Sequence, residues 1–215
     1  MTVNDIYFTV QDRINKHNTG SNQNISERQF VGAFNMALYF WFDQRVKVEE
    51  GNKILATELQ SFIVNLKQVP SYNEDYYFIL LPEDYYYYKR VKVRATKESC
   101  GEQDLTVRIV EESNIDTYLQ SDLDKPSFKW QDTVGSIASN EVHVYHGDDF
   151  KVTNINLVYY KKPTEIAMEA VSGVNTTTTL EGSSLYEVIN FTALILASDI
   201  KDGASIQTLR NLLNQ

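Results

Sequence analysis

The chain of 215 residues has one cysteine, four prolines and only twenty basic residues. A single cysteine, Cys100, cannot form a disulfide within the chain, which is typical of proteins that assemble in a reducing compartment. The 29 acidic residues give a formal net charge of −9. This charge argues against a protein that coats duplex DNA, because neutralising phosphates requires a basic surface.

Long hydrophobic runs are also missing. The most apolar stretch, Leu185–Ala197, is too short to span a bilayer. The N-terminus lacks a basic start followed by an apolar stretch, so we expect no signal peptide. The hydrophobic share is nevertheless 42%, with 12% aromatic residues, which argues against disorder. These features predict a soluble protein with a real core and no membrane contact.

The sequence lacks the common motifs of catalysis and of nucleotide or metal binding. His143 and His146 lie three apart on a predicted strand, hence on opposite faces, so they would share a metal only if the strand broke there. With Asp148 they leave a metal-dependent hydrolase as one possible class. We interpret them instead as a hairpin turn with an exposed histidine at its shoulder. We therefore predict that the protein is not an enzyme and needs no cofactor or metal.

Helical patterns are present at both ends of the chain. Over residues 2–16 apolar side chains follow three- and four-residue spacing. Ser26 and Gln29 have the spacing of a capping box and open a second predicted helix that carries Trp41. A third helix is predicted to contain Ile54, Leu55, Leu59, Phe62, Ile63 and Leu66. Two more are predicted over residues 184–199 and 205–214.

Between Tyr76 and Tyr160 the hydrophobic period changes to two, which predicts successive strands. Asn114–Asp122 is predicted to be a short helical excursion. This order predicts an α+β fold, in which the N- and C-terminal helices form a helical bundle and the middle of the chain forms an antiparallel β block, sandwich- or barrel-like. The predicted parts are a helical part (1–70), a β domain (71–166), a polar loop or arm (167–183, including Asn175–Thr179) and closing helices (184–215).

The segment EDYYYYKRVKVRA (Glu83–Ala95) places four tyrosines beside basic residues. Strict alternation along a strand predicts one mostly apolar face and one aromatic and cationic face. The apolar face would hold Tyr85, Tyr87, Lys89, Val91, Val93 and Ala95. The second face, which we name the tyrosine–basic ladder, would hold Tyr86, Tyr88, Arg90, Lys92 and Arg94.

Three interpretations of this ladder are open. It could contact an acidic surface of a neighbouring copy, since tyrosine and arginine are enriched in interfaces. It could stack single-stranded nucleic acid, or be an ordinary surface strand with cross-strand charge pairs. The negative net charge favours the protein interface. Trp41 and Trp130 are predicted to lie in the core, because a tryptophan on a helix or strand is usually packed.

Several segments resemble phage head-to-tail connector proteins. They are MTVNDIYFTVQDRINK at the start, FVGAFNMALYFWF, LPEDYYYYKRVKV, the lone cysteine, PSFKWQDTVGSIASNEVHVY and INLVYYKKPTEI. In this order they are similar to the ring (adaptor) proteins of crAss-like tailed phages, and more distantly to adaptors of other short-tailed phages. The resemblance covers roughly residues 1–166 and the closing helices.

The resemblance implies a structural virion protein rather than an enzyme. Such proteins stack as rings below the portal, so the implied partners are further copies in a homododecameric ring, the portal protein and neighbouring tail rings. DNA would pass through the channel during ejection without specific binding. The implied location is the neck of the virion, after assembly in the host cytoplasm. The alternative from the residues alone is a single-strand nucleic-acid-binding module that uses the same ladder.

Overall fold

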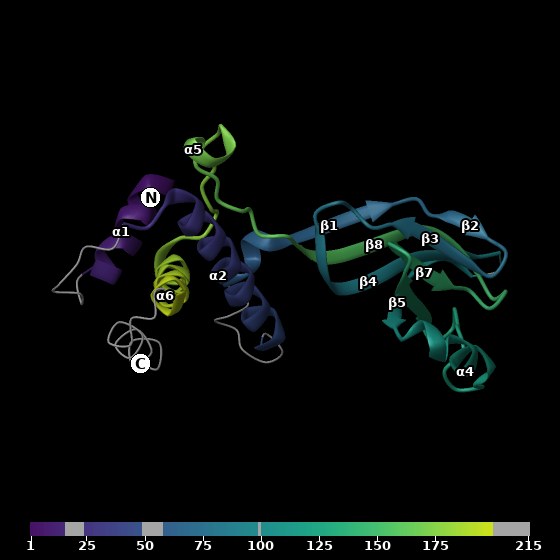
Figure 1. Ribbon diagram of the computed structural model, residues 1–215. Helices are drawn as coiled ribbons and strands as arrows, with labels where there is room; N and C mark the ends of the chain where they lie inside the picture. The colour runs from purple at the N-terminus through teal and green to yellow at the C-terminus, as the bar shows by residue number, and fades with distance from the viewer. Residues whose placement is uncertain (16–23, 49–57, 99, 200–215) are drawn as a thin grey trace. The chain divides into compact units, whose positions relative to one another are not determined.

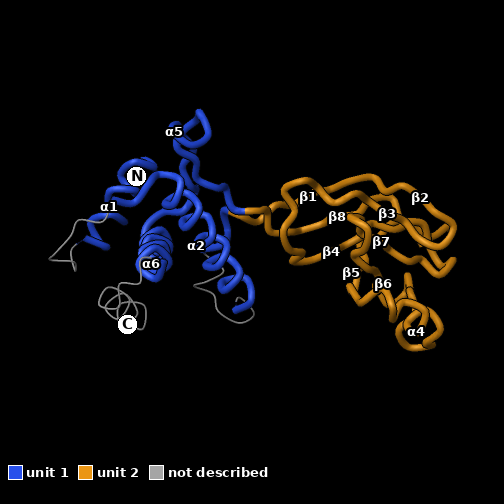
Figure 2. The backbone as a smooth tube through the Cα atoms, in the orientation of Figure 1, with its two compact units in different colours: residues 1–61, 163–215 blue, residues 62–162 orange. Residues whose placement is uncertain are grey.

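The computed structural model describes residues 1–15, 24–48, 58–98 and 100–199 (Figure 1). The fold is α+β, as predicted. The chain divides into two compact units, residues 1–61 with 163–215, and residues 62–162 (Figure 2). The first unit is helical and the second contains the sheet. Both ends of the chain therefore contribute to one helical unit.

The helical unit is built from α1 (Val3–Asn15), α2 (Glu27–Val48), α5 (Glu169–Ser172) and α6 (Gly182–Asp199). The predicted capping box is confirmed, because the backbone N–H of Gln29 donates to Ser26 Oγ and the backbone N–H of Ser26 donates to Gln29 Oε1. Helix α6 packs against both α1 and α2. The buried residues of α1 are those of the predicted apolar face: Val3, Ile6, Val10 and Ile14.

Trp41 is 1% exposed, which confirms its predicted place in the core. Its indole N–H donates to Glu187 Oε2 on α6 at 2.8 Å. The same carboxylate accepts a hydrogen bond from Arg45, and the Arg45 guanidinium also lies 3.4 Å from Glu58. Buried polar groups are stable only when paired. This shared carboxylate therefore ties α2 to α6 in a defined register.

The polar arm predicted at residues 167–183 has local order. An antiparallel bridge joins Ala167 to Thr176, and the Asn175 side chain accepts a hydrogen bond from the Glu169 amide at the start of α5. Leu180 is buried. The predicted helix over residues 205–214 lies outside the described residues.

The prediction of a third helix that included Ile63 and Leu66 is wrong. A 3-10 turn, η1 (Gln60–Phe62), leads directly into strand β1 (Ile63–Gln68); residues 54–57 are outside the described part. Val64 and Leu66 pack against the core of the sheet while Asn65 is exposed, which is the two-residue period of a strand. The sheet unit therefore starts at Phe62, earlier than the predicted boundary at residue 71.

The sheet has eight strands in the order β1-β8-β4-β5-β6-β7-β3-β2. The strands after β1 are β2 (Ser71–Asn73), β3 (Tyr76–Leu80), β4 (Tyr85–Lys97), β5 (Gly101–Ile109), β6 (Asp132–Ala138), β7 (Glu141–Tyr145) and β8 (Lys151–Lys161). All neighbours pair antiparallel except β5 and β6, which are parallel. Their connection holds η2 (Glu112–Asn114) and α4 (Ile115–Gln120), the predicted helical excursion.

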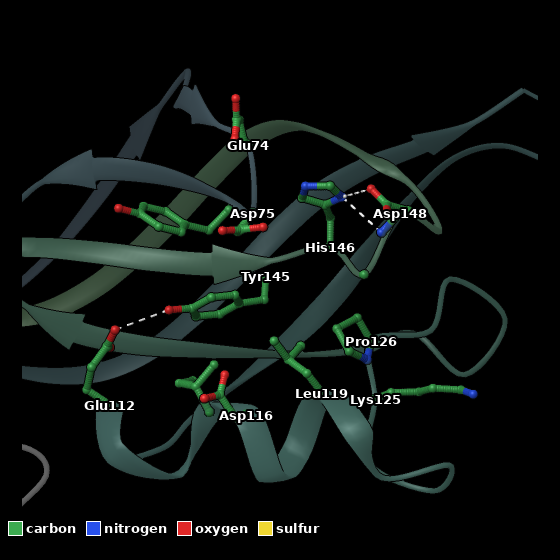
Figure 3. A pocket seen from close by; sticks show the side chains of 13 residues that line it. Glu74, Asp75, Glu112, Asp116, Leu119, Lys125, Pro126, Tyr145, His146 and Asp148 are labelled. Carbon is green, nitrogen blue, oxygen red and sulfur yellow. Dashed lines mark hydrogen bonds and ion pairs between the residues drawn. The ribbon is translucent and has the colours of Figure 1, made fainter.

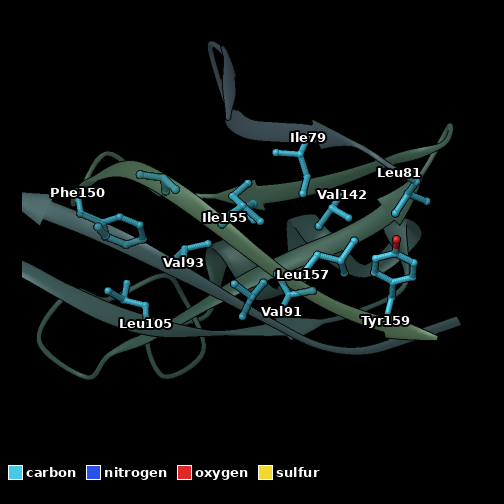
Figure 4. Packing of buried hydrophobic residues seen from close by; sticks show 14 of the residues in the cluster. Ile79, Leu81, Val91, Val93, Leu105, Val142, Phe150, Ile155, Leu157 and Tyr159 are labelled. Carbon is cyan, nitrogen blue, oxygen red and sulfur yellow. The ribbon is translucent and has the colours of Figure 1, made fainter. Parts of the chain in front are cut away.

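The sheet curls around its own core. Strands β1 and β2 are at opposite ends of the strand order, yet only Val69 and Pro70 separate them in the chain. Three Cα–Cα steps span at most about 11 Å, so the two edges approach each other at this corner. The enclosed face carries the main apolar cluster, shown in Figure 4. Its members come from all parts of the sheet and include Ile79, Val91, Leu105, Val142, Ile155 and Leu157.

One half of the outer surface is also covered. Over β6, β7 and β3 a second cluster joins Val134 and Tyr145 to Ile115 at the start of α4. Strand β7 is consequently buried on both faces from Val142 to Tyr145. Among the described helices, none is long and apolar enough to cross a membrane.

Trp130 is not in the core, contrary to the prediction. Its side chain is 76% exposed and Lys129 Nζ lies 5.5 Å from the ring centroid. The residue sits in a tight turn just before β6, where Ser127 bridges to Asp132 and Gln131 has a φ of 56°. Phe128 fills the core position of this segment instead, so the turn points Trp130 to solvent.

Candidate interaction surfaces of the sheet

The tyrosine–basic ladder does not follow strict alternation along its whole length. Strand β4 has register shifts against β8 between Tyr85 and Tyr87 and between Tyr88 and Arg90. A β-bulge adds one residue to a strand, and the residues after it then point to the opposite face. As a result Tyr85 and Tyr88 both pack against the main core. Tyr88 therefore leaves the ladder, which corrects its predicted outward position.

The remaining tyrosines are placed differently from one another. Tyr86 is half-buried, whereas Tyr87 is 53% exposed and stacks on Tyr88 with ring centroids 5.8 Å apart. Lys89, at the second bulge, donates from Nζ to Tyr160 Oη at 2.7 Å. A single well-exposed ring remains in this tyrosine run, so the segment does not offer the row of open aromatic rings that base stacking would use.

Beyond the bulges the predicted alternation holds. Val91, Val93 and Ala95 are buried in the main core, and Arg90, Lys92 and Arg94 lie on the outer face. Lys92 pairs in register with Asn156 on β8, and Asn156 pairs with Lys67 on β1. Lys67, Arg90, Lys92 and Arg94 together form what we name the basic face. It spans β1, β8 and β4.

Two carboxylates on β5 act on the basic face: Asp104, which contacts Arg94, and Glu102, whose charge also helps to raise the pKa of Arg94. Arg94 Nε donates to Asp104 Oδ1 on β5 at 3.0 Å. The pKa of Asp104 is lowered, first by the hydrogen bond from Arg94 and further by the charges of Lys92 and Lys67. In the described part of the chain, the Arg90 side chain makes no hydrogen bond or ion pair. Arg90 and Lys92 are therefore available to a partner.

A small hollow of about 110 Å³ lies within the basic face, between Lys67, Lys92 and Arg94. The Asn156 side-chain oxygen is buried there and accepts no hydrogen bond from any described residue. In the unfolded chain this oxygen accepts a hydrogen bond from water, so burying it without a donor costs free energy.

A second surface has the opposite charge. A cavity of about 540 Å³ opens beside α4 and the β2–β3 turn (Figure 3). Five carboxylates line this acidic pocket: Glu74, Asp75, Glu112, Asp116 and Asp148. The cation in its wall is Lys125, and Lys125 Nζ is held by Asp122 at 2.8 Å. The pocket therefore has an excess of negative charge.

Two polar side chains shape the floor of the acidic pocket. Tyr145 Oη donates to Glu112 Oε1 at 3.2 Å. Burial, with the nearby Glu112 charge, raises the pKa of Tyr145 to about 12. His146 is 6% exposed, so the prediction of an exposed histidine at this turn is wrong. Its ring lies against Tyr77, with centroids 5.3 Å apart.

The tautomer of His146 is set by its contacts. The Asp148 backbone N–H donates to Nδ1 at 3.1 Å, so the neutral ring carries its hydrogen on Nε2. Nε2 is buried and has no hydrogen-bond partner among the described residues. In Figure 3, Nδ1 faces Asp148 and Nε2 is on the far side of the ring. His146 thus keeps a buried Nε2 that has no partner among the described residues, and its ring packs against Tyr72 and Tyr77.

His143 and His146 do not form a common site. His143 lies on the outer face of β7, where its ring stacks on Tyr76 with centroids 4.4 Å apart and Nε2 contacts Glu141 at 3.0 Å. Ser136, its cross-strand neighbour, is fully buried. Within the described ranges, no group of three histidine, cysteine or acidic side chains is placed to hold a metal ion. The arrangement thus offers no support for the hydrolase hypothesis.

Sequence reasoning missed several members of both surfaces. Lys67 was assigned to the end of a helical segment, which hid its place beside Lys92. The acidic pocket brings together residues from the β2–β3 turn, α4 and the β7–β8 connection, a grouping that only the tertiary fold creates. The signal that could have found Lys67 was the alternation of Val64 and Leu66 with Asn65 and Lys67.

No protein-family model matches the chain, and no curated protein sequence is significantly similar to it. Function is therefore inferred from the charge and geometry of the basic face and the acidic pocket, together with the segments that resemble phage connectors.

Proposed function

We propose that the protein is a structural subunit that assembles with copies of itself into a ring, as a head-to-tail connector (adaptor) of a tailed phage. The ring would be a homododecamer below the portal protein and against neighbouring tail rings, with DNA passing through its channel. The observation that carries the proposal is the basic face. It concentrates Lys67, Arg90, Lys92 and Arg94 on one surface of a chain whose net charge is −9.

Such a face favours an acidic protein partner. At short range, the basic side chains of one copy are attracted to an acidic surface of the next copy, and this local complementarity favours association. An arginine or lysine side chain that contacts no carboxylate of its own chain can pair across an interface without breaking an ion pair within the monomer. Arg90 is such a group within the described residues. A second copy supplies the needed acidic surface without any other protein.

Single-stranded nucleic acid is the rival partner for the same face. The bulges of β4 turn Tyr85 and Tyr88 into the core, so the run of four tyrosines presents Tyr87 as its well-exposed ring. Stacking platforms combine several open aromatic rings with a basic groove. The placement of the tyrosines therefore weakens this alternative relative to a protein partner.

The test is a double charge reversal, Arg90→Glu with Lys92→Glu, in the full chain. Arg94 is left unchanged because Asp104 engages it. Sedimentation velocity should show the wild type as a multi-subunit species at roughly 20 mM salt, and salt near 500 mM should weaken it by screening. The double variant should stay monomeric with an unchanged circular dichroism spectrum.

A matched control, Arg28→Glu with Lys47→Glu, makes the same charge change on two exposed residues of the helical unit and should leave association intact. A wild type that remains monomeric at every concentration contradicts the proposal. Tight binding of a labelled single-stranded oligonucleotide that weakens steeply with salt would support the nucleic-acid alternative instead.

A further inference from the structure

We infer that the Trp130 side chain of one copy inserts into an aromatic cavity beside the basic face of the next copy. This inference rests on the proposed function and adds the residue that anchors the contact and the cavity that receives it. The cavity has a volume of about 860 Å³ and lies where β2 and β3 meet the end of β4 and the start of β8. We name it the aromatic pocket; its wall includes Tyr72, Tyr77, Thr96, Glu98, Phe150 and Lys151.

Trp130 is held in a position that suits a partner. Its side chain is 76% exposed, which leaves a large apolar ring in water. The backbones of Ser127 and Asp132 exchange two hydrogen bonds across the turn, at 2.9 and 3.3 Å, and Phe128 packs in the main core. Gln131 has a φ of 56°, a conformation that residues other than glycine seldom adopt. The turn is therefore fixed before binding, so little conformational entropy is lost when the ring enters a pocket.

The aromatic pocket has the chemistry to receive an indole ring. Tyr72 and Tyr77 lie with ring centroids 4.9 Å apart, and Phe150 adds a third ring to the wall. Tyr72 is 59% exposed, so its ring is open to an incoming group. Aromatic rings attract one another at centroid distances of about 4.5 to 7 Å. Trp130 is not among the residues that line the pocket of its own chain, so the ring that fills it comes from a second copy.

The aromatic pocket continues the basic face along β4. Thr96, in the pocket wall, is two residues beyond Arg94, and Ala95 between them is buried in the main core. Lys151 on β8 pairs in register with Thr96 and also lines the pocket. A copy that covers the basic face therefore also reaches the pocket.

The segment that carries Trp130 has the charge that the basic face attracts. Residues 111–132, which hold α4 and the Trp130 turn, contain six acidic and two basic residues, a net charge of −4. One of the two lysines, Lys125, is engaged by Asp122. Local complementarity of this kind fixes the register of two partners. This segment is therefore the acidic surface that we assign to the neighbouring copy.

A lysine next to Trp130 matches a carboxylate of the aromatic pocket. Lys129 Nζ lies 5.5 Å from the Trp130 ring centroid, so it enters the pocket with that ring. Glu98 is exposed in the pocket wall and makes no ion pair within the described residues. The two charges can then pair across the interface. Because the Trp130 turn and the pocket are different surfaces, each copy uses them toward two neighbours, which is the heterologous contact of a closed ring.

The first test is Trp130→Ala in the full chain. The ring is exposed, so the circular dichroism spectrum should match that of the wild type. Association at low salt, measured by sedimentation velocity, should weaken at least about tenfold, because a tryptophan seated in a pocket is typical of the residues that dominate an interface. The control, Phe8→Ala, removes another exposed aromatic ring from the helical unit and should associate as the wild type does.

A double-mutant cycle tests the contact itself. Tyr72→Ala removes the open ring of the pocket and should also weaken association. If Trp130 and Tyr72 touch across the interface, the variant with both changes should be hardly weaker than the weaker of the two single variants. Losses that simply add would show that the two residues act at separate places.

The fluorescence of Trp130 reports the same contact without any substitution. The chain has two tryptophans, and Trp41 is 1% exposed, so quenching by acrylamide arises mainly from Trp130. Quenching should fall as the wild type associates at low salt. In the variant with Arg90→Glu and Lys92→Glu it should stay high at every concentration. Quenching that is unchanged by association would overturn the inference.

The outcomes separate this inference from the proposed function. If the basic-face variant loses association while Trp130→Ala and Tyr72→Ala keep it, the chain self-assembles and the insertion of Trp130 is wrong. If Phe8→Ala weakens association as much as Trp130→Ala, exposed apolar surface in general drives it, and the specific contact is overturned. If the wild type itself never associates, the proposed function fails, and the inference fails with it.

Discussion

The two halves of the sheet have the same kind of inner face and very different outer faces. Over β1, β8 and β4 the outer face is polar and basic around Lys67, Lys92 and Asn156, although Val158 and Tyr160 at the end of β8 are buried. Over β6, β7 and β3 it is covered by α4, and Val134 and Tyr145 form a second apolar cluster there. The covered half therefore packs apolar side chains on both faces, against the main core on one side and against α4 on the other. The open half packs mainly on its inner face. We expect the covered half to carry stability and the open half to carry contact with partners.

The largest expected difference comes from one aromatic residue in each half. Tyr145→Ala should destabilise the sheet unit by about 3 kcal/mol, because it removes a buried ring and leaves a cavity under α4. Tyr87→Ala, at a ring that is 53% exposed, should change the free energy of unfolding by less than about 0.5 kcal/mol. Urea unfolding followed by circular dichroism measures both. Equal losses of unfolding free energy in the two variants would show that the two halves contribute alike to stability.

A smaller effect is expected at Gly135, on the β6 side. A Cβ atom at this position would lie 2.5 Å from the His143 carbonyl oxygen and 2.7 Å from Val107 Cγ1. Because one of these neighbours is backbone, Gly135→Ala should cost about 2 kcal/mol. Gly32→Ala is the control, since a Cβ atom there meets nothing within 4 Å and helix α2 should gain up to about 1 kcal/mol. Thermal unfolding of both variants should shift in opposite directions.

The Asp149 side chain links the two halves of the sheet through its hydrogen bonds. Its carboxylate accepts a hydrogen bond from Lys97 on β4 and another, at 2.7 Å, from the Phe128 amide ahead of β6. Burial alone would raise the pKa of Asp149, but these hydrogen bonds outweigh it and lower the pKa. The stabilisation is therefore present above the ordinary aspartate pKa and is lost as the pH falls through the lowered value.

Asp149→Asn should cost on the order of 1 kcal/mol at neutral pH. The difference in unfolding free energy between wild type and variant should narrow in acid, as the pH falls below the ordinary aspartate pKa and the wild-type carboxylate protonates. Urea midpoints at neutral and at acid pH measure this change. A gap that stays constant with pH would show that charge on Asp149 does not matter.

A further predicted effect appears only at alkaline pH. Burial raises the pKa of Tyr145 to about 12, so the folded state holds the phenol proton more tightly than the unfolded state does. The resulting stability is present below about pH 10 and is lost as the pH rises toward 12. Tyr145→Phe should make unfolding less dependent on pH in this window. Tyr159, whose pKa is also raised to about 12 by burial and its bond to Asp84, should still titrate in that variant.

The covered half could not have been recognised from the sequence. In EVHVY (Glu141–Tyr145) polar and apolar residues alternate, as in a strand with one open face. The structure buries His143 and Tyr145 as well as the valines, because a helix from an earlier part of the chain lies over this half of the sheet. Alternation reports which residues share a face and does not report what covers it.

The open half was predicted more accurately. Alternation correctly placed Val91, Val93 and Ala95 inside, with Arg90, Lys92 and Arg94 outside. It failed at Tyr88, which packs inside, and at Tyr87, which was placed on the apolar face and is exposed. A β-bulge depends on how the partner strand pairs rather than on the strand's own residues. The helices α1 and α2 were predictable from their periodicity, and α2 also from its capping box. The parallel pairing of β5 with β6 was not, since it depends on the path of a long connection.

The short link Val69–Pro70 has a consequence for how copies can meet. A sheet edge with free backbone N–H and C=O groups invites a strand from another chain to add to it, which leads to uncontrolled aggregation. Here the chain itself runs from edge strand β1 to edge strand β2 at this corner. Pro70 has no backbone N–H and cannot donate a hydrogen bond to an incoming strand. Edge strand β2 is only three residues long. The short edge and the proline thereby limit strand addition at this corner, so association of copies would have to use side chains instead.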